Sequence, residues 1–339
     1  MKEASFYKKL SGALIQCNLC PHQCRIKEGC FGLCGVRENR GGVLYTYSYG
    51  NIASVNVDPV EKKPLYHFLP GSKTFSFACA GCNFKCTFCQ NWQISQPPFF
   101  LGINSPKNIL SAQDLVEGAL REDCRSLSYT YTEPAIFFEY AYDVAKIAKK
   151  HKLRNIFVTN GYIKEEPLRK IAPYLDAVNI DLKFFKESSY KKFCNASLSA
   201  VLESIRLFKS LCLWIEITTL VIPGVNDSKG ELKEIADFIA GLDINIPWHI
   251  SRFYPNYQLA DYPITPEERL KEAQGIGLEA GVRFVYAGNV RGWGEDTLCP
   301  YCYKVLIKRD GFRIEEYNIA SGNCKFCQGI IPGVFSYVE

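Results

Sequence analysis

Three cysteines lie close together in the chain, at Cys82, Cys86 and Cys89, with the spacing C-x3-C-x2-C. Cysteine thiolates are the usual protein ligands of iron–sulfur clusters, and a cubane [4Fe–4S] cluster has four corner irons. Three thiolates therefore leave one iron without a protein ligand. Such an open position can bind a substrate or cofactor, as the open position of a catalytic zinc ion does. The spacing predicts a reactive iron–sulfur centre; a zinc knuckle or an accidental group of thiols is the alternative.

The chain around this loop alternates predicted strands with predicted helices. Strands are expected at 74–78, 126–130, 155–159, 177–182, 213–221, 248–254 and 283–286, and helices at 111–120, 134–150, 165–174, 229–240 and 266–280. Ser111 is the expected N-cap of the first helix. This alternation predicts an α/β fold of parallel βαβ units, closed fully or partly into a (β/α) barrel. Chemistry in such barrels lies at the C-terminal ends of the strands, and the cysteine loop follows the first strand.

Polar residues follow most of the later strands at the same end. They are Thr132, Glu133 and Pro134 after the second strand, Asn160 and Gly161 after the third, Asp181 and Lys183 at the fourth, residues 223–227 after the fifth, and His249, Arg252 and Tyr254 on the sixth. At any single position a capping or turn role explains the residue equally well. Their occurrence at successive strand ends favours a binding site.

Histidine is the side chain best suited to proton transfer near neutral pH, and the chain has 4 of them. His67 and His249 are the main candidates, and Tyr254 competes with His249 because it is nearer the strand end. His67 belongs to the segment 58–67, which precedes the first strand. That segment is either part of the substrate side or a linker that docks through apolar residues such as Leu65 and Tyr66.

A second group of cysteines lies near the N-terminus, within a glycine-rich, loop-rich segment. A small module with so little apolar sequence usually needs a metal to fold. The predicted ligands are Cys17, Cys20, Cys24 and Cys34, with Cys30 or His22 as substitutes. Structural zinc and an auxiliary iron–sulfur cluster both fit four thiolates, and the spacing does not decide between them.

A third group comprises two C-x2-C pairs near the C-terminus, Cys299 with Cys302 and Cys324 with Cys327. Strand-like runs at 304–307 and 312–314 lie between the pairs. Two such knuckles joined by a hairpin are typical of a zinc ribbon. We therefore expect zinc here. Because the basic residues nearby are offset by acidic ones, we expect the module to fasten the end of the chain and not to bind nucleic acid.

Composition limits the remaining possibilities. The chain has 339 residues, 47% of them hydrophobic, which is enough for a full barrel core with small appendages. The net charge of +5 is small against 40 basic and 35 acidic residues, so nucleic-acid binding is not indicated. No apolar run approaches a membrane span and no signal peptide is evident. We expect a cytoplasmic protein, in which 16 cysteines indicate metal ligands before disulfides.

The C-x3-C-x2-C loop, with Phe88 before its last cysteine, resembles the signature of the radical S-adenosylmethionine (SAM) superfamily. The resemblance implies that SAM binds the open iron through its amino and carboxylate groups, beside Phe88. It also implies reductive cleavage of SAM to a 5′-deoxyadenosyl radical. Thr132-Glu133-Pro134 resembles the family's glycine-glycine-glutamate-proline motif with both glycines replaced. By this resemblance the SAM-contacting residues are Phe88, Thr132, Glu133, Pro134, Asn160, Gly161, Asp181 and Lys183.

The strand ends from residue 159 onward resemble those of pyruvate formate-lyase activating enzymes. Together with the N-terminal cysteines, the segment 58–67 and the C-terminal knuckles, they resemble the radical SAM enzymes of the AmmeMemoRadiSam system. The expected domains are an N-terminal module at 1–70, the barrel at 71–290 and a ribbon-like module at 291–339. The resemblance implies an electron donor such as ferredoxin or flavodoxin, and a substrate that could be a protein glycine. The alternative is a non-catalytic metal-binding or nucleic-acid-binding scaffold.

Overall fold

The computed structural model describes residues 1–96 and 109–336. Residues 97–108 of the predicted barrel and 337–339 of the predicted C-terminal module lie outside the described residues. The chain divides into two compact units. Unit 1 comprises Met1–Asp58, Lys73–Val178 and Phe193–Leu213, and unit 2 comprises Pro59–Ser72, Asn179–Lys192 and Trp214–Glu339.

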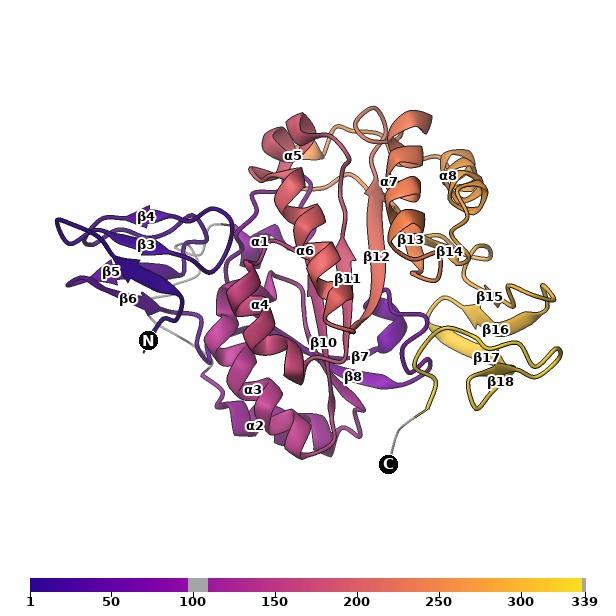
Figure 1. Cartoon of the computed structure of the whole chain (residues 1–339), viewed down its shortest axis with the longest axis horizontal. Helices are drawn as coiled ribbons and strands as arrows, with labels where there is room; N and C mark the ends of the chain where they lie inside the picture. The colour runs from indigo at the N-terminus through magenta and orange to yellow at the C-terminus, as the bar shows by residue number, and fades with distance from the viewer. Residues whose placement is uncertain (97–108, 337–339) are drawn as a thin grey trace. The chain divides into compact units, whose positions relative to one another are not determined.

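The central element is an eight-stranded sheet with the order β14-β13-β12-β11-β10-β9-β8-β7 (Figure 1). The pairs β8–β9, β9–β10, β12–β13 and β13–β14 are all parallel, so their carboxyl ends point the same way. The strands are β7 (Ile52–Pro59), β8 (Lys73–Cys79), β9 (Ser126–Tyr129), β10 (Arg154–Thr159), β11 (Ala177–Asp181), β12 (Trp214–Val221), β13 (Trp248–Arg252) and β14 (Val285–Gly288). The seven predicted strands are confirmed, the last with a shift of two residues. The sequence did not predict β7.

Helices separate the successive parallel strands, as the alternation predicted. They are α1 (Trp92–Ser95), α2 (Ala112–Arg121), α3 (Phe138–Lys150), α4 (Glu165–Ile171), α5 (Glu187–Cys194), α6 (Leu198–Ser210), α7 (Lys229–Leu242) and α8 (Glu267–Glu279). Short 3-10 turns lie at Val60–Lys62, Pro134–Phe137, Ala172–Tyr174 and Tyr257–Leu259. The prediction missed α5 and α6, between the fourth and fifth strands.

The burial of the strands explains why they form a parallel sheet. Six of the seven residues of β8 are buried, and all four residues of β9 are. Burial at successive positions, including the Ser and Thr residues, shows that these strands are covered on both faces. A helix must approach closely to cover them: a Cβ on Gly277 of α8 would lie 2.9 Å from Trp248 of β13. Glycine at that position therefore lets α8 pack directly on the sheet.

The N-terminal segment forms two small three-stranded antiparallel sheets, one of order β1-β6-β5 and one of order β2-β3-β4. Their strands are only two to four residues long: β1 (Lys2–Glu3), β2 (Tyr7–Lys9), β3 (Ile15–Cys17), β4 (Arg25–Ile26), β5 (Arg37–Arg40) and β6 (Val43–Thr46). The side-chain amide of Asn39 bonds the carbonyls of Ala13 and Ile26 at 2.8 Å each. Because Asn39 lies in β5 and Ile26 in β4, this side chain joins the two sheets.

The C-terminal segment is a ribbon with a small core of its own. Its strands are β15 (Thr297–Leu298), β16 (Val305–Asp310), β17 (Arg313–Tyr317), β18 (Ile319–Ala320) and β19 (Asn323–Cys324). The core contains Leu306, Ile307, Ile319 and Ile331 together with two of the predicted ligand cysteines. This arrangement confirms the predicted hairpin between two cysteine knuckles.

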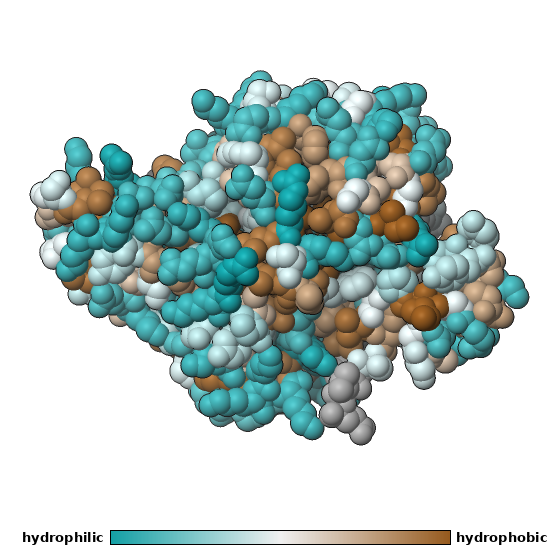
Figure 2. All heavy atoms as spheres, viewed as in Figure 1, coloured by the Kyte–Doolittle hydropathy of each residue, from teal (hydrophilic) through white to brown (hydrophobic). Residues whose placement is uncertain are grey.

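The molecular surface seen in Figure 2 is mainly hydrophilic, with smaller hydrophobic areas between the polar side chains. Among the described residues, none of the helices has the length and apolar character needed to cross a membrane.

Candidate active site

The loop that carries Cys82, Cys86 and Cys89 begins directly after β8. Backbone hydrogen bonds hold it on two sides: Gly81 donates to Ile94, and Lys85 and Thr87 donate to Cys194 and Phe193. Gly81 has a φ of 98°, a left-handed conformation that glycine adopts without strain. The loop is therefore fixed by contacts outside its own sequence.

The three sulfur atoms of the loop lie apart. The Cys86 sulfur lies 3.5 Å from that of Cys194, and the Cys89 sulfur lies 3.1 Å from the Ser95 hydroxyl. In the described part of the chain, only the C-terminal cysteines bring three or more ligand atoms within 4.8 Å of one another. Thiolates of a cubane bind different corner irons and need not meet at one point. Cys82, Cys86 and Cys89 are therefore not gathered around one point as the ligands of a single ion would be.

The surroundings of Cys82 oppose loss of the proton from its thiol group. Burial, and next the nearby Glu133 carboxylate, raise the pKa of Cys82 well above its usual range. A thiol binds metal only after it loses its proton. Iron would supply the positive charge that makes this ionisation favourable.

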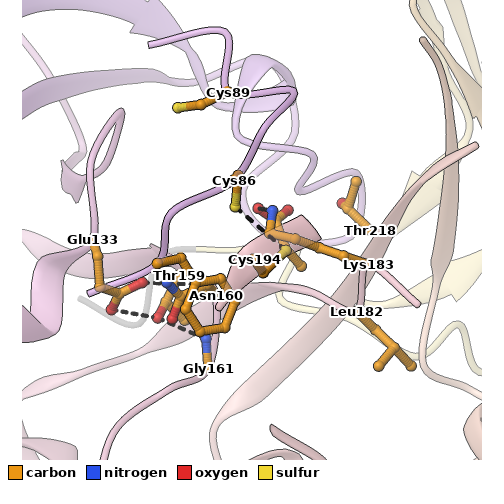
Figure 3. A network of polar contacts seen from close by, with 12 residues as sticks. Cys86, Cys89, Glu133, Thr159, Asn160, Gly161, Leu182, Lys183, Cys194 and Thr218 are labelled. Carbon is orange, nitrogen blue, oxygen red and sulfur yellow. Dashed lines mark hydrogen bonds and ion pairs between the residues drawn. The ribbon is translucent and has the colours of Figure 1, made fainter. Parts of the chain in front are cut away.

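Glu133 lies at the centre of a polar network at the ends of β9 and β10 (Figure 3). One carboxylate oxygen accepts hydrogen bonds from the Thr159 hydroxyl, at 2.7 Å, and from the Ala135 backbone N–H, at 3.0 Å. The other accepts from the Asn160 backbone N–H at 2.8 Å. Gly161, with a φ of 72°, turns the chain and donates its N–H to Thr159. The network orients the Glu133 carboxylate, which is buried.

Asn160 connects this network to the cysteine loop. Its side-chain amide donates to the Asn83 side chain at 2.8 Å and lies 3.9 Å from the Cys82 sulfur. Asn83 in turn donates to the backbone carbonyl of Tyr162 at 2.9 Å. Two predicted site residues, Glu133 and Asn160, are thus brought next to Cys82. Asn83 was not predicted as a site residue, although its place between two predicted ligands was a usable signal.

Three more residues of unit 1 were predicted to contact the cofactor: Thr132, Pro134 and Phe88. The Thr132 hydroxyl donates to the Cys79 carbonyl at 2.6 Å, at the end of β8. Pro134 begins the 3-10 turn Pro134–Phe137, and the Phe88 side chain is buried. Cys194 is buried, and its contact with Cys86 places it beside the candidate cluster loop.

In unit 2, Asp181 and Lys183 form an ion pair of 2.7 Å at the end of β11. The Lys183 backbone is fixed on both sides, because its N–H donates to the Tyr190 hydroxyl and its carbonyl accepts from Asn226. Asn226 also accepts from the Ile222 N–H at 2.7 Å. The segment 223–227 therefore supports the strand end that carries Lys183.

His249 lies inside unit 2, where its ring is 2.6 Å from the Glu216 carboxylate. Glu216 is fully buried and also accepts from the backbone N–H groups of Tyr66 and His67 and from the Trp214 indole. His67 is buried as well, between the Tyr286 hydroxyl at 2.6 Å and the Pro332 carbonyl at 2.7 Å. The segment before β8 is therefore docked through its backbone. Glu216, a lone carboxylate within an apolar strand, was not predicted from the sequence to have this role.

Tyr254 is 41% exposed, and its hydroxyl donates to the Asn289 carbonyl at 3.1 Å. Its hydroxyl thus has a backbone partner within unit 2.

The C-terminal cysteines bring four sulfur atoms within 4.8 Å of one another. The sulfur atoms of Cys299 and Cys327 are 3.6 Å apart and those of Cys302 and Cys324 are 3.8 Å apart. Zinc in a tetrahedron of sulfurs at about 2.3 Å gives sulfur–sulfur distances of about 3.8 Å. Burial opposes ionisation of Cys324, but the backbone N–H groups of Cys327 and Phe326 lower its pKa to about 7. These four residues could therefore hold a metal ion of the size of zinc.

The N-terminal cysteines are arranged differently. The side chains of Cys17, Cys20, Cys24 and Cys34 line one pocket. Cys30, a possible substitute ligand, is exposed and is not among the residues that line it. His22 does line the pocket, and its Nε2 bonds the Asn83 carbonyl at 2.8 Å.

The comparisons with known proteins agree with this geometry. Residues 78–239 match the Radical SAM superfamily. The chain is 44% identical over 332 residues to an uncharacterized protein of Methanocaldococcus jannaschii, covering 96% of this chain and 98% of the relative. It is 25% identical to a putative glycyl-radical enzyme activating enzyme of the same organism, covering 59% of this chain and 74% of the relative. It is 21% identical to the pyruvate formate-lyase-activating enzyme of Staphylococcus epidermidis, covering 60% of this chain and 88% of the relative.

Among solved structures, a radical SAM methyltransferase from Sphaerobacter thermophilus has the same fold, with a TM-score of 0.51 at 18% identity. The alignment covers 66% of this chain and 68% of that chain. The chain belongs to the radical SAM superfamily, and it is a radical SAM enzyme with activating-enzyme-like relatives. Membership of this superfamily implies a [4Fe–4S] cluster and SAM as cofactors. The expected fold class is confirmed.

Proposed function

We propose that this enzyme reductively cleaves SAM at a [4Fe–4S] cluster held by Cys82, Cys86 and Cys89, and that the resulting 5′-deoxyadenosyl radical abstracts hydrogen from a substrate. The observation that carries the proposal is the fixed loop of three separated sulfurs with the Glu133 carboxylate beside Cys82. The cluster, when bound, supplies the electron for SAM cleavage.

The residues around the loop would bind and orient SAM. Glu133 offers a carboxylate held by Thr159 and Asn160, which suits the positive ammonium group of SAM. The turn at Gly161 lets the backbone approach the cofactor. We assign Thr132, Pro134 and Phe88 to the walls of the same site, and the Asp181–Lys183 pair to the ribose and carboxylate of SAM.

The substrate that fits the relatives best is a glycine residue of a partner protein. The activating-enzyme names of two relatives support this assignment. We assign proton transfer to His249 or Tyr254. The required electron would come from a ferredoxin or flavodoxin-type protein. We propose zinc at the four C-terminal cysteines, within a module at 291–339 that is separate from the barrel at 71–290 and the N-terminal module at 1–70.

The test uses anaerobically purified, reconstituted enzyme supplied with dithionite and SAM. We expect release of 5′-deoxyadenosine by the wild type and by Cys124→Ala, which changes a buried cysteine outside the loop. Cys86→Ala should release none, because loss of one thiolate leaves the cluster incompletely held. Undiminished release by Cys86→Ala would show that the reaction does not take place at this loop.

A further inference from the structure

The pocket at the N-terminal cysteines is the strongest feature that SAM cleavage does not use. Four cysteines from different parts of the segment line it, Cys17, Cys20, Cys24 and Cys34. Cys17 ends β3, and Cys34 lies just before β5. Four cysteines around one pocket, in a segment of very short strands, point to a bound metal centre that helps the segment to fold.

The distances between the sulfurs indicate how large this centre is. At the C-terminal site the four sulfurs lie within 4.8 Å of one another, which is the size of a single ion. Within the described residues no three of the N-terminal cysteines meet this limit, although four of them line a common pocket. A cubane cluster does not need its thiolates to meet at one point, because each thiolate binds a different iron. The four C-terminal sulfurs are therefore gathered as around a single ion, and the four N-terminal cysteines are not.

The charge around the pocket also suits a cluster. Arg37 is buried and lines the pocket, and its Nη1 atom lies 4.0 Å from the Cys17 sulfur. Its Nη2 atom forms a two-pronged ion pair with Glu139 of α3, at 2.7 and 2.8 Å. The remaining guanidinium nitrogen, Nε, is buried and has no hydrogen-bond partner in the described structure. A buried unpaired N–H is costly, and a sulfur of a bound cluster would accept it.

We propose that this pocket holds a second, auxiliary [4Fe–4S] cluster ligated by Cys17, Cys20, Cys24 and Cys34, with Arg37 as its charge partner. All four irons then have protein ligands, so this cluster has no open position for SAM. His22 is a positioning residue and not a ligand through Nε2, since that atom bonds the Asn83 carbonyl. Asn83 lines the pocket and directly follows Cys82. The auxiliary cluster therefore lies next to the loop of the first.

The experiment removes the first cluster and counts the metals that remain. A chain with Cys82, Cys86 and Cys89 all changed to alanine is reconstituted anaerobically with iron and sulfide. We expect about four irons per chain, and an electron paramagnetic resonance signal of a reduced cluster after dithionite. This variant cannot cleave SAM by design, so its iron content tests the auxiliary cluster separately from the proposed function.

Two further substitutions in this background identify the ligands. Cys20→Ala should remove the remaining iron and its signal, with the zinc content unchanged. Cys30→Ala is the matched control and should retain both, because Cys30 is exposed and outside the pocket. Zinc bound at both terminal sites with no iron in the triple variant would overturn the proposal.

If the triple variant does not fold, the wild type decides the question. About eight irons per chain support two clusters, whereas about four irons with two zinc ions overturn the auxiliary cluster. The wild type should also show magnetic coupling between its two reduced clusters, since Asn83 joins their sites. Cys20→Ala in the wild-type background should abolish this coupling and leave the spectrum of the first cluster.

Discussion

Single residues in this enzyme illustrate how burial changes the role of a charged side chain. Glu216 lies in β12 with no exposure, yet three N–H groups and the His249 ring surround its carboxylate. A buried carboxylate is stable only when such donors replace water. Its function in unit 2 is to hold the backbone of Tyr66 and His67. A polar residue in an apolar strand is therefore not always a site residue.

Glu133 is the carboxylate that we expect to contact SAM, and its conversion to glutamine tests this role. Glu133→Gln keeps the size of the side chain but removes the charge that pairs with the ammonium group. Loss of a hydrogen bond to a charged group costs about 1.5–3 kcal/mol, so the Kd for SAM should rise about 10- to 100-fold. Calorimetric titration of SAM into the reconstituted enzyme measures this change.

The matched control for that experiment is Glu165→Gln, on the exposed first turn of α4. It should leave the affinity for SAM unchanged. An unchanged Kd in Glu133→Gln, together with a lower unfolding temperature, would assign Glu133 a purely structural role through Thr159 and Asn160.

The buried His67 makes the stability of the fold depend on pH. Burial lowers the pKa of His67 from its usual 6.5 to about 4. Because the unfolded chain binds this proton more tightly, the stabilisation is complete above about pH 6.5 and is lost as the pH falls towards 4. At Glu216, burial alone would raise the pKa of the carboxyl group, but the hydrogen bond and charge of His249 lower it below its usual value. This shift also makes the fold less stable as the pH falls.

The unfolding free energy should therefore fall by up to about 3 kcal/mol between pH 6.5 and 4 through His67. Urea unfolding at a series of pH values measures the slope. His67→Gln removes the titrating ring and should flatten the profile in this range, whereas His151→Gln, at the exposed end of α3, should not. Equal slopes in all three proteins would show that His67 is not the group responsible.

At the scale of elements, the parallel strands and their helices were predictable because their patterns are local. The apolar run of β8 and the N-cap at Ser111 are each visible in a few residues. The strands of the N-terminal sheets have two to four residues, too few to show a period. The burial of His249 was also not predictable, because it depends on Glu216 of a neighbouring strand.

The cap of α2 is an element whose contribution can be measured alone. The Ser111 hydroxyl accepts from the Asp114 backbone N–H, and the Asp114 carboxylate accepts from the Ser111 N–H, which makes a complete capping box. Ser111→Ala should lower the unfolding free energy by about 1 kcal/mol. Chemical denaturation measures the loss.

Ser188→Ala, on the exposed first turn of α5, is a suitable comparison and should have a smaller effect. Release of 5′-deoxyadenosine should be unaffected in both variants, because neither residue belongs to the candidate active site. A loss of activity in Ser111→Ala without a loss of stability would contradict the role given to this cap.

Across the whole molecule, three cysteine groups differ in how their sulfurs are arranged. The four C-terminal sulfurs converge, the four N-terminal cysteines surround a pocket, and the three of the loop after β8 lie apart. Cysteine spacing predicted all three groups but not the metal of each, because the metal depends on distances that the fold alone determines. On the proposed assignments, cysteine serves structural and catalytic chemistry in the same chain.

If the C-terminal cysteines hold a structural zinc ion, its loss should affect stability without affecting the first cluster. Cys327→Ala should lower zinc by about one ion per chain and lower the unfolding temperature by about 5 °C, corresponding to a loss of about 2 kcal/mol. The visible absorption of the first cluster should be unchanged, because we assign its ligands to Cys82, Cys86 and Cys89. Cys212→Ala, at another exposed cysteine, should change neither quantity. If Cys327→Ala lost iron together with zinc, the C-terminal module would be needed for binding of the first cluster, and its role would not be confined to stability.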